Sequence, residues 1–148
     1  MAKYNKDNSA AKFSGLSGAT TSSARRYFTD GKYKAKILEF VDGTTRDGKD
    51  FVAAKFEIIE SNNEDFKPGD EVSWFNYIPG KDGIGLGNLK GFLMAALGCK
   101  EDEIEDNDAV EAVSEEQPLV DAVVNAMAVT IQTKAGADFT AVNFSAVQ

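Results

Sequence analysis

Lysines and aromatic residues are interleaved between Lys32 and Ile78, and they are the side chains of this sequence best suited to bind a ligand. Cations contact phosphates and aromatic rings stack on bases, so the combination is typical of proteins that bind single-stranded nucleic acid without sequence preference. Each stacked base contributes about 1–3 kcal/mol, and the ionic contribution weakens as salt rises. The candidate nucleic-acid-binding residues are Lys34, Lys36, Arg46, Lys49, Lys55, Trp74, Phe75, Tyr77 and Lys81.

Three alternating runs must position these residues. Their β-branched and aromatic content predicts strands over residues 32–41, 51–60 and 71–78, joined as an antiparallel meander. Asp-Gly pairs lie in the connection at 42–50, which is long for a hairpin and is expected to project from the sheet. A Pro-Gly turn at 68–69 leads into the third strand.

Alternation separates the core face of the meander from its outer face, because successive side chains of a strand point in opposite directions. In the first run the lysines at 32, 34 and 36 share one face, which must be the solvent face, and Glu39 falls on the other. In the second run the apolar set fills the core. The residues left outside are Phe51, Ala53, Lys55 and Glu57.

The third run has aromatic residues in both alternating sets, so its phase matters most for function. We place Val72, Trp74 and Ile78 inside, which puts Phe75 and Tyr77 outside and near Lys55 on the neighbouring strand. Alternation alone does not decide between the two phases, and Trp74 therefore stays among the candidate residues.

The rest of the chain supplies one helix and two more strands. Apolar residues at helical spacing predict an amphipathic helix over 89–97, which begins at the N-cap Asn88, follows a flexible glycine-rich connection and ends at Gly98. A short helix is expected near 108–113. Strands are expected at 128–133 and 139–147 with a hairpin loop at 134–138.

The resulting order β-β-β-α-β-β predicts a mainly β protein with a five-stranded OB-fold-like barrel, the helix plugging one end. An SH3-like barrel or another small α+β roll is the alternative. In the OB-fold the outer face of strands 2 and 3 and the loops after strands 1 and 4 form the default binding surface. Residues 1–29, rich in small and polar residues, are expected to form a flexible N-terminal arm before a single domain at 30–148.

Charge is distributed unevenly along the chain. The net charge is −8, yet residues 1–98 contain 14 Lys and Arg against 13 Asp and Glu, whereas residues 99–148 contain 2 against 11. The excess lies mainly in an acidic insertion at about 100–118. The leading expectation for this segment is a solvated acidic loop. The alternative is a mobile anionic segment that competes with DNA for the basic face or recruits replication or recombination proteins through residues 101–116.

Several other functions have little support in the sequence. The chain has no histidine and one cysteine, Cys99, so we expect no catalytic function, no metal and no cofactor. The glycines at 83, 85 and 87 lack the βαβ context of a dinucleotide site. No stretch resembles a secretory signal or a membrane span, and a single cysteine suits a reducing compartment, so a cytoplasmic protein is expected.

Residues 30–147 resemble the single-stranded-DNA-binding OB-fold proteins of tailed bacteriophages. The resemblance implies non-catalytic single-stranded DNA binding in phage replication, recombination or repair, within the host cytoplasm. Many such proteins end in an acidic tail that recruits partners, whereas here the acidic residues precede strand 4. The matching positions are Gly31-x-Tyr33-x-Ala35-x-Ile37, Ala54-x-Phe56-x-Ile58, Lys67-x-Gly69-x-x-Val72, Leu89-Lys90-x-Phe92-Leu93-x-Ala95-x-Leu97-Gly98 and a final hairpin that includes Asn143.

The sequence therefore predicts a protein that coats single-stranded DNA through stacking and phosphate contacts. The alternative is a non-catalytic structural or interaction β-barrel, such as a virion or adaptor protein, that binds a partner through the acidic segment. A small nucleotide-handling enzyme is a third, weaker hypothesis. The oligomeric state stays open, a dimer being one option.

Overall fold

The computed structural model describes residues 26–132 and 138–147. Five strands are present: β1 (Gly31–Thr44), β2 (Asp50–Ser61), β3 (Glu71–Ile78), β4 (Val123–Gln132) and β5 (Asp138–Ala146). Between β3 and β4 lie η2 (Lys81–Gly83), α2 (Ile84–Leu97), η3 (Glu101–Glu103) and α3 (Asp106–Ala112). The predicted element order, mainly β with the principal helix between the third and fourth strands, is confirmed.

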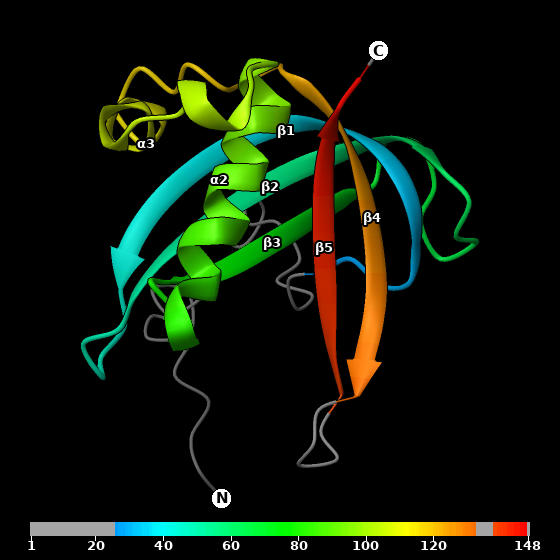
Figure 1. The fold of residues 1–148 in the computed structure, drawn as a ribbon. Coiled ribbons are helices and arrows are strands. Elements are labelled where there is room, and N and C mark those ends of the chain that lie inside the picture. Colours follow the sequence, from blue (N-terminus) through cyan, green and yellow to red (C-terminus); the bar gives the residue numbers. More distant parts are fainter. Residues whose placement is uncertain (1–25, 133–137, 148) are drawn as a thin grey trace, which may run out of the picture.

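All five strands belong to one antiparallel sheet in the order β3-β2-β1-β4-β5. The sheet curves strongly, and β1 arches from its pairing with β4 to the far end of β2 (Figure 1). Among the described strands β3 and β5 are not hydrogen-bonded to each other, so the sheet is open between its two edges. Helix α2 lies along this opening, where it packs against β5 and β3.

The curved sheet and α2 enclose a core rich in aromatic rings. The ring of Phe144 on β5 lies 5.0 Å from Trp74 on β3, 5.1 Å from Phe92 on α2 and 5.6 Å from Phe56 on β2, measured between centroids. Edge-to-face and offset pairs of this kind stabilise a core beyond their buried area. Phe144 therefore joins the last strand to the meander and to the helix.

The face assignments from alternation hold until β1 changes register. Tyr33, Ala35 and Ile37 are buried, as predicted, but a shift between Ile37 and Glu39 brings Phe40 into the core and leaves Glu39 exposed. The expectation that Glu39 faces inward is therefore wrong, because a β-bulge inserts a residue that simple alternation does not count.

The segment before β4 covers β1 beyond the bulge. The N–H of Ile37 donates to the carbonyl of Ala122 and the N–H of Asp121 donates to the carbonyl of Ile37, both at 2.8 Å. Further along β1, the Gln117 side chain pairs with the backbone of Phe40 as a neighbouring strand would. Its Oε1 accepts from the N–H of Phe40 at 2.8 Å, and its Nε2 donates to the carbonyl of Phe40 at 2.7 Å.

Replacing Gln117 by alanine removes both partners of the Phe40 backbone. We expect Gln117→Ala to lower the free energy of unfolding by about 1–3 kcal/mol, the range for leaving buried polar groups unpaired. Chemical denaturation measures this loss. The exposed neighbour Glu116 is the control, and Glu116→Ala is expected to change stability little. Equal effects of the two substitutions would contradict the role given to the Gln117 amide.

Helix α2 begins five residues earlier than the sequence suggested. Gly83 is its N-cap and Gly85 lies within its first turn, so the prediction of a flexible glycine-rich connection and of an Asn88 cap is wrong. Asn88 instead donates from Nδ2 to Oδ1 of Asn76 on β3 at 3.3 Å. The predicted end is confirmed, because Gly98 adopts φ 67° and its N–H donates to the carbonyl of Met94.

Other expectations concern the ends of the chain. The predicted arm at 1–29 lies outside the described residues except for its last four, of which Phe28 is buried in the core. The predicted hairpin loop after β4 also lies largely outside them. No helix in the described part of the chain has the length and apolar character needed to cross a membrane.

Candidate nucleic-acid interface

Three aromatic side chains, Phe51, Phe75 and Tyr77, form a cluster on the outer face of β2 and β3. Phe51 is directly opposite Tyr77, and Phe75 is the next outward residue along β3. The rings of Phe51 and Phe75 stack at 4.7 Å with 28° between their planes, and Phe75 meets Tyr77 edge-on at 4.9 Å. Tyr77 is 46% exposed, so this aromatic cluster presents ring surface to solvent.

Gly43 of β1 makes room for the cluster. It lies opposite Phe51, and a Cβ atom at Gly43 would lie 2.6 Å from Cζ and 3.0 Å from Cε1 of the Phe51 ring. The backbone at Gly43 is not in the left-handed region, so glycine is needed here for space rather than for its φ angle. The tip of the Phe51 ring therefore reaches over β1 because this position has no side chain.

Gly43→Ala is expected to displace the Phe51 ring and to destabilise the fold by about 1–3 kcal/mol, the range for overpacking. Phe51→Ala in the same chain removes the clash, so the double variant should lose less stability than the sum of the two single variants. Chemical denaturation of the four proteins of this cycle measures the difference. Simple additivity would show that the ring does not rest on Gly43.

Tyr27 adds a fourth ring, held beside β3 by its neighbour Arg26. The carbonyl of Arg26 accepts from the N–H of Ser73 at 2.7 Å, and its guanidinium lies 4.2 Å from the ring centroid of Phe66 and 3.4 Å from Oδ2 of Asp70. Tyr27 is 48% exposed. It shares with Phe75 and Lys55 a shallow hollow of about 160 Å³.

The anchor of Tyr27 persists at neutral pH. The N–H of Lys67 donates to the Asp70 carboxylate at 2.9 Å, and this hydrogen bond, with the nearby Arg26 charge, holds the pKa of Asp70 below its usual value. A depressed carboxyl pKa contributes stability that is present above the unfolded-state value and is lost as pH falls through the folded-state value. Acid, rather than base, therefore loosens this contact.

One of the candidate cations, Lys49, lies next to the aromatic cluster. Lys49 places Nζ 5.5 Å from the ring centroid of Tyr77, and these two residues border a hollow of about 500 Å³ with Pro79 and Gly80. Arg46 is exposed in the same β1–β2 loop. A cation beside an exposed ring is the pairing that a nucleotide needs, with its phosphate on the ammonium and its base on the ring.

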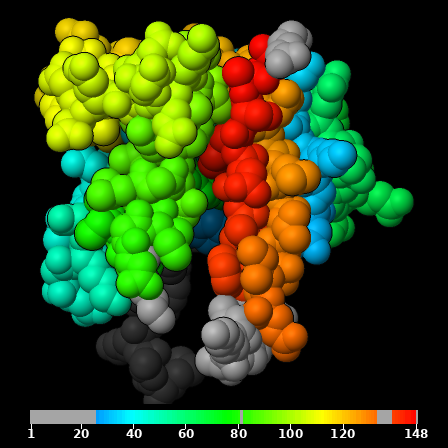
Figure 2. Space-filling model, in the orientation of Figure 1, coloured from blue at the N-terminus to red at the C-terminus, as the bar shows by residue number. Residues whose placement is uncertain are grey.

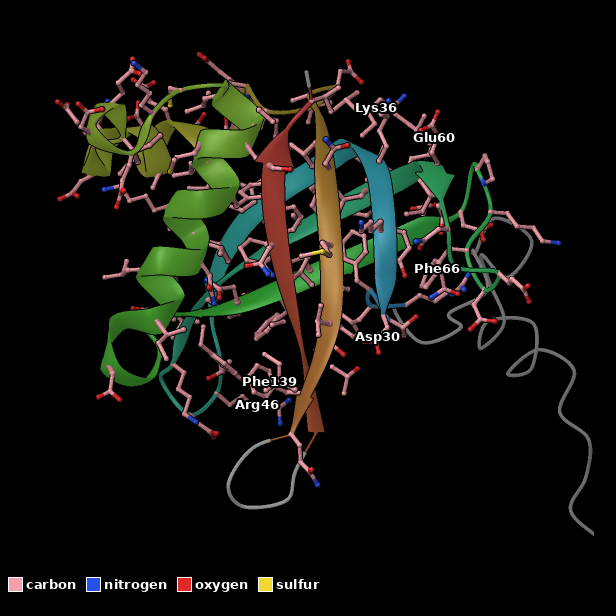
Figure 3. All side chains as sticks on the ribbon, turned by 45° about the vertical axis from the view of Figure 1, so that its right-hand side comes forward. Asp30, Lys36, Arg46, Glu60, Phe66 and Phe139 are labelled. Atoms are coloured by element: carbon pink, nitrogen blue, oxygen red, sulfur yellow. The ribbon has the colours of Figure 1, made fainter. Side chains whose placement is uncertain are left out.

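The other predicted lysines lie elsewhere or are paired. Lys36 is opposite Glu57, six residues along β2 from Phe51, which corresponds to about 20 Å at the rise of a strand. Lys36 stands near the top of the β1 arch, far from Arg46 (Figure 3). Ion pairs neutralise part of the charge of Lys34, Lys36 and Lys55; their carboxylate partners are Glu60 at 3.8 Å, Glu57 at 3.9 Å and Glu71 at 3.0 Å.

Trp74 does not belong to the interface. Only 7% of this residue is exposed, and its ring packs 5.2 Å from Phe92, so it cannot receive a base. The inward phase assigned to β3 is thus confirmed, and the inclusion of Trp74 among the binding residues is wrong. Lys81 begins η2, and its side chain lies outside the described part of the structure.

Sequence reasoning left Phe51 and Tyr27 out of the candidate set. Alternation had placed Phe51 outside, and the hairpin register that puts it opposite Tyr77 was the missing signal. Tyr27 carries no periodic signal, because it precedes β1 and its position depends on the contacts of Arg26 with residues about 40 positions later.

The acidic segment contains the short helix predicted near 108–113, as α3, but it packs against the core instead of forming the expected solvated loop. η3 and α3 are held against the core by partly buried Ile104, Ala109 and Val113 and by buried Ala112. It forms a lobe at the end of α2, away from the β4–β5 face (Figure 2). Within the described residues no group of three or more Cys, Asp or Glu side chains is arranged to hold a metal ion.

Comparison with known proteins gives no family for this chain: no family model matches it, and no curated protein matches it either.

Proposed function

We propose that this protein binds single-stranded nucleic acid without sequence preference, through the aromatic cluster and the cations beside it. The observation that carries the proposal is the group of mutually packed, outward-facing rings on β2 and β3, of which Tyr77 is exposed and has Lys49 next to it. Rings that already pack against one another lose little side-chain entropy when a base stacks on them. The protein acts as a non-catalytic coat for exposed strands.

The strand order supports an OB-fold for this surface. The sheet runs β3-β2-β1-β4-β5 with a helix between β3 and β4, and Phe144 on β5 packs against Trp74 on β3. In this proposal β3 and β5 face each other across the opening, and the barrel places the aromatic cluster on its usual binding face. The loop after β1, the end of β4 and the start of β5 lie toward the same end of the molecule (Figure 1).

The resemblance to phage single-stranded-DNA-binding proteins gives the proposal its biological setting. The protein coats strands exposed during replication, recombination or repair of phage DNA in the host cytoplasm. The acidic lobe, rather than a C-terminal tail, recruits the partner proteins.

Fluorescence anisotropy of labelled oligo-dT tests the proposal. At about 50 mM salt the protein should bind in the micromolar range or tighter. Phe75→Ala and Tyr77→Ala should each weaken binding by about 5-fold to 150-fold, which corresponds to the 1–3 kcal/mol of one stacked base. The absence of binding at micromolar protein under these conditions would refute the function.

Two controls distinguish a loss of contacts at the binding face from a general effect of mutation on the protein. Val110→Ala removes an exposed apolar side chain of α3 and should leave binding unchanged. Trp74 is the only tryptophan and lies on the core side of β3, so DNA should alter its fluorescence little. Strong quenching of Trp74 by DNA would instead mean that the binding surface includes this residue.

Salt dependence gives a second measure of the interface. Lys49 lies beside Tyr77, Lys55 lies beside Phe75 and Arg46 is exposed in the β1–β2 loop. Three phosphate contacts from these cations give a slope of log K against log salt of about −2 for a single strand. A much steeper slope would indicate that the lysines on the other half of β1 also contact phosphates.

A second candidate function rests on the acidic lobe. Its carboxylates are exposed and ordered on η3 and α3, and Val110 stands among them with 64% of its surface exposed. A non-catalytic interaction protein would present this lobe to a basic partner. Loss of partner capture after replacement of Val110 and its acidic neighbours, with oligo-dT binding unchanged, would favour this function.

A further inference from the structure

A groove of about 700 Å³ lies on the outer face of β1, β4 and β5 and is bordered by the end of β2, separate from the aromatic cluster. These three strands run side by side on the right of the molecule in Figure 2. The strand register sets two rows across the groove. Lys34, Asn125 and Ser145 form one row, and Lys32, Met127 and Asn143 form the next.

Two amides in this groove have no hydrogen-bond partner in the described structure. Seven asparagines lie in the described ranges, and the side chains of five of them make hydrogen bonds within the chain. The two others, Asn125 and Asn143, both line the groove on adjacent strands. Asn125 is half-buried and Asn143 is exposed, so both amides are open to a ligand that enters the groove.

The cations of the groove lie beside these amides. Lys34 is directly opposite Asn125, and Lys32 is opposite Met127. Lys34 has a loose ion pair with Glu60 at 3.8 Å, whereas no ion pair of Lys32 is found in residues 26–132 and 138–147. The Lys32 backbone is fixed by Asn62, whose Oδ1 accepts from its N–H at 2.8 Å.

We propose that this groove binds an adenine nucleotide unit, as a free nucleotide or as part of a strand. Lysine ammonium groups hold the phosphate, and an asparagine amide both donates to and accepts from the edge of adenine. Met127 offers an adaptable apolar contact to the base or sugar. The volume lies within the range of small-molecule sites, about 300–1,000 Å³.

Titration of ¹⁵N-labelled protein with AMP tests the proposal. AMP in the millimolar range should shift the side-chain amide resonances of Asn125 and Asn143. Inorganic phosphate and adenosine, each lacking one half of the ligand, should bind more weakly than AMP. Absence of shifts at these amides at the highest AMP concentration would overturn the proposal.

The AMP affinities of variants test whether AMP binds in the groove. Lys32→Gln with Lys34→Gln, and separately Asn143→Ala, should weaken AMP binding at least about tenfold. Lys90→Gln, on α2 and outside the groove, should leave it unchanged. Unchanged AMP affinity in both groove variants would also overturn the site, whatever oligo-dT binding shows.

Comparing oligonucleotides of different length shows whether the nucleotide in the groove belongs to a bound strand or is free. If a bound strand supplies the nucleotide, long oligo-dA should bind more tightly than oligo-dA of five residues. The groove variants should then lower the affinity for long oligo-dA to that for the short oligomer, which should still bind. If free nucleotide is the ligand, AMP should bind without competing with either oligomer. Both results support the groove as a nucleotide site.

Discussion

Gly85→Ala is expected to destabilise the protein by about 3 kcal/mol, at the upper end of the range for overpacking. Gly85 is buried in the first turn of α2, where a Cβ atom would lie 1.8 Å from the carbonyl oxygen of Tyr77 and 2.8 Å from that of Pro79. Both are backbone atoms, so no side-chain rotation relieves the clash. The first turn of α2 would have to leave β3.

That movement would also break hydrogen bonds between the helix and the strand. Asn76, buried on β3, donates from Nδ2 to the carbonyl of Gly85 at 2.8 Å, and Leu86 donates to the carbonyl of Pro79 at 3.3 Å. The Asn76 side chain would lose the partner that its burial requires. The loss of stability therefore combines steric overlap with an unpaired polar group.

Gly87→Ala is the matched control, two residues further along the same helix. No atom lies within 4 Å of a Cβ built at Gly87. Alanine should therefore raise stability by about 1 kcal/mol through its better helix propensity. Chemical denaturation of both variants gives the comparison. If Gly85→Ala were as stable as wild type, residues 83–87 would be the open connection that the glycine pattern suggested.

Phe144→Ala should cost about 3 kcal/mol, the lower end of the range for truncating a core phenylalanine, because Phe144 is partly buried. Its ring meets Trp74, Phe92 and Phe56 at 5.0–5.6 Å, so the substitution removes contacts to β2, β3 and α2 together. A smaller side chain at 144 leaves a cavity where these elements meet. The last strand would then be held mainly by its pairing with β4.

Two measurements check this expectation. Chemical denaturation should show the loss of stability, and the near-ultraviolet circular dichroism of Trp74 should change, because Phe144 packs edge-on against its ring. Phe139→Ala on the same strand is the control, since Phe139 is 50% exposed. It should cost much less. Similar losses from both variants would contradict a central position for Phe144.

The sequence predicted the sheet better than it predicted the helix. Alternation placed the core of β2 and β3 correctly because one face of each strand is buried and the period of two is strict. It failed at Glu39, where a bulge interrupts that period. It also failed at Gly85. Glycine ordinarily disfavours helices, but here it is required because a Cβ atom would overlap the backbone of Tyr77 and Pro79, a contact that helical periodicity does not reveal.

The candidate site was predicted in part for a similar reason. The outward orientation of Phe75 and Tyr77 follows from local alternation, so it could be predicted from the sequence. How far Lys36 lies from them depends on the length and arch of β1, which no local pattern gives. The ion pairs of Lys34, Lys36 and Lys55 depend on strand register, and Tyr27 depends on contacts of Arg26 with a distant turn.

The double pairing of β1 has a consequence for folding. Its contacts with β2 close a short hairpin, whereas its contacts with β4 join residues about ninety positions apart. Short loops close at a lower entropic cost than long ones, so the meander of β1, β2 and β3 can form first. During synthesis this meander exposes Phe56 and Trp74 until β5 supplies Phe144. The nascent chain is therefore most prone to aggregation after the proposed binding surface has formed and before the core is covered.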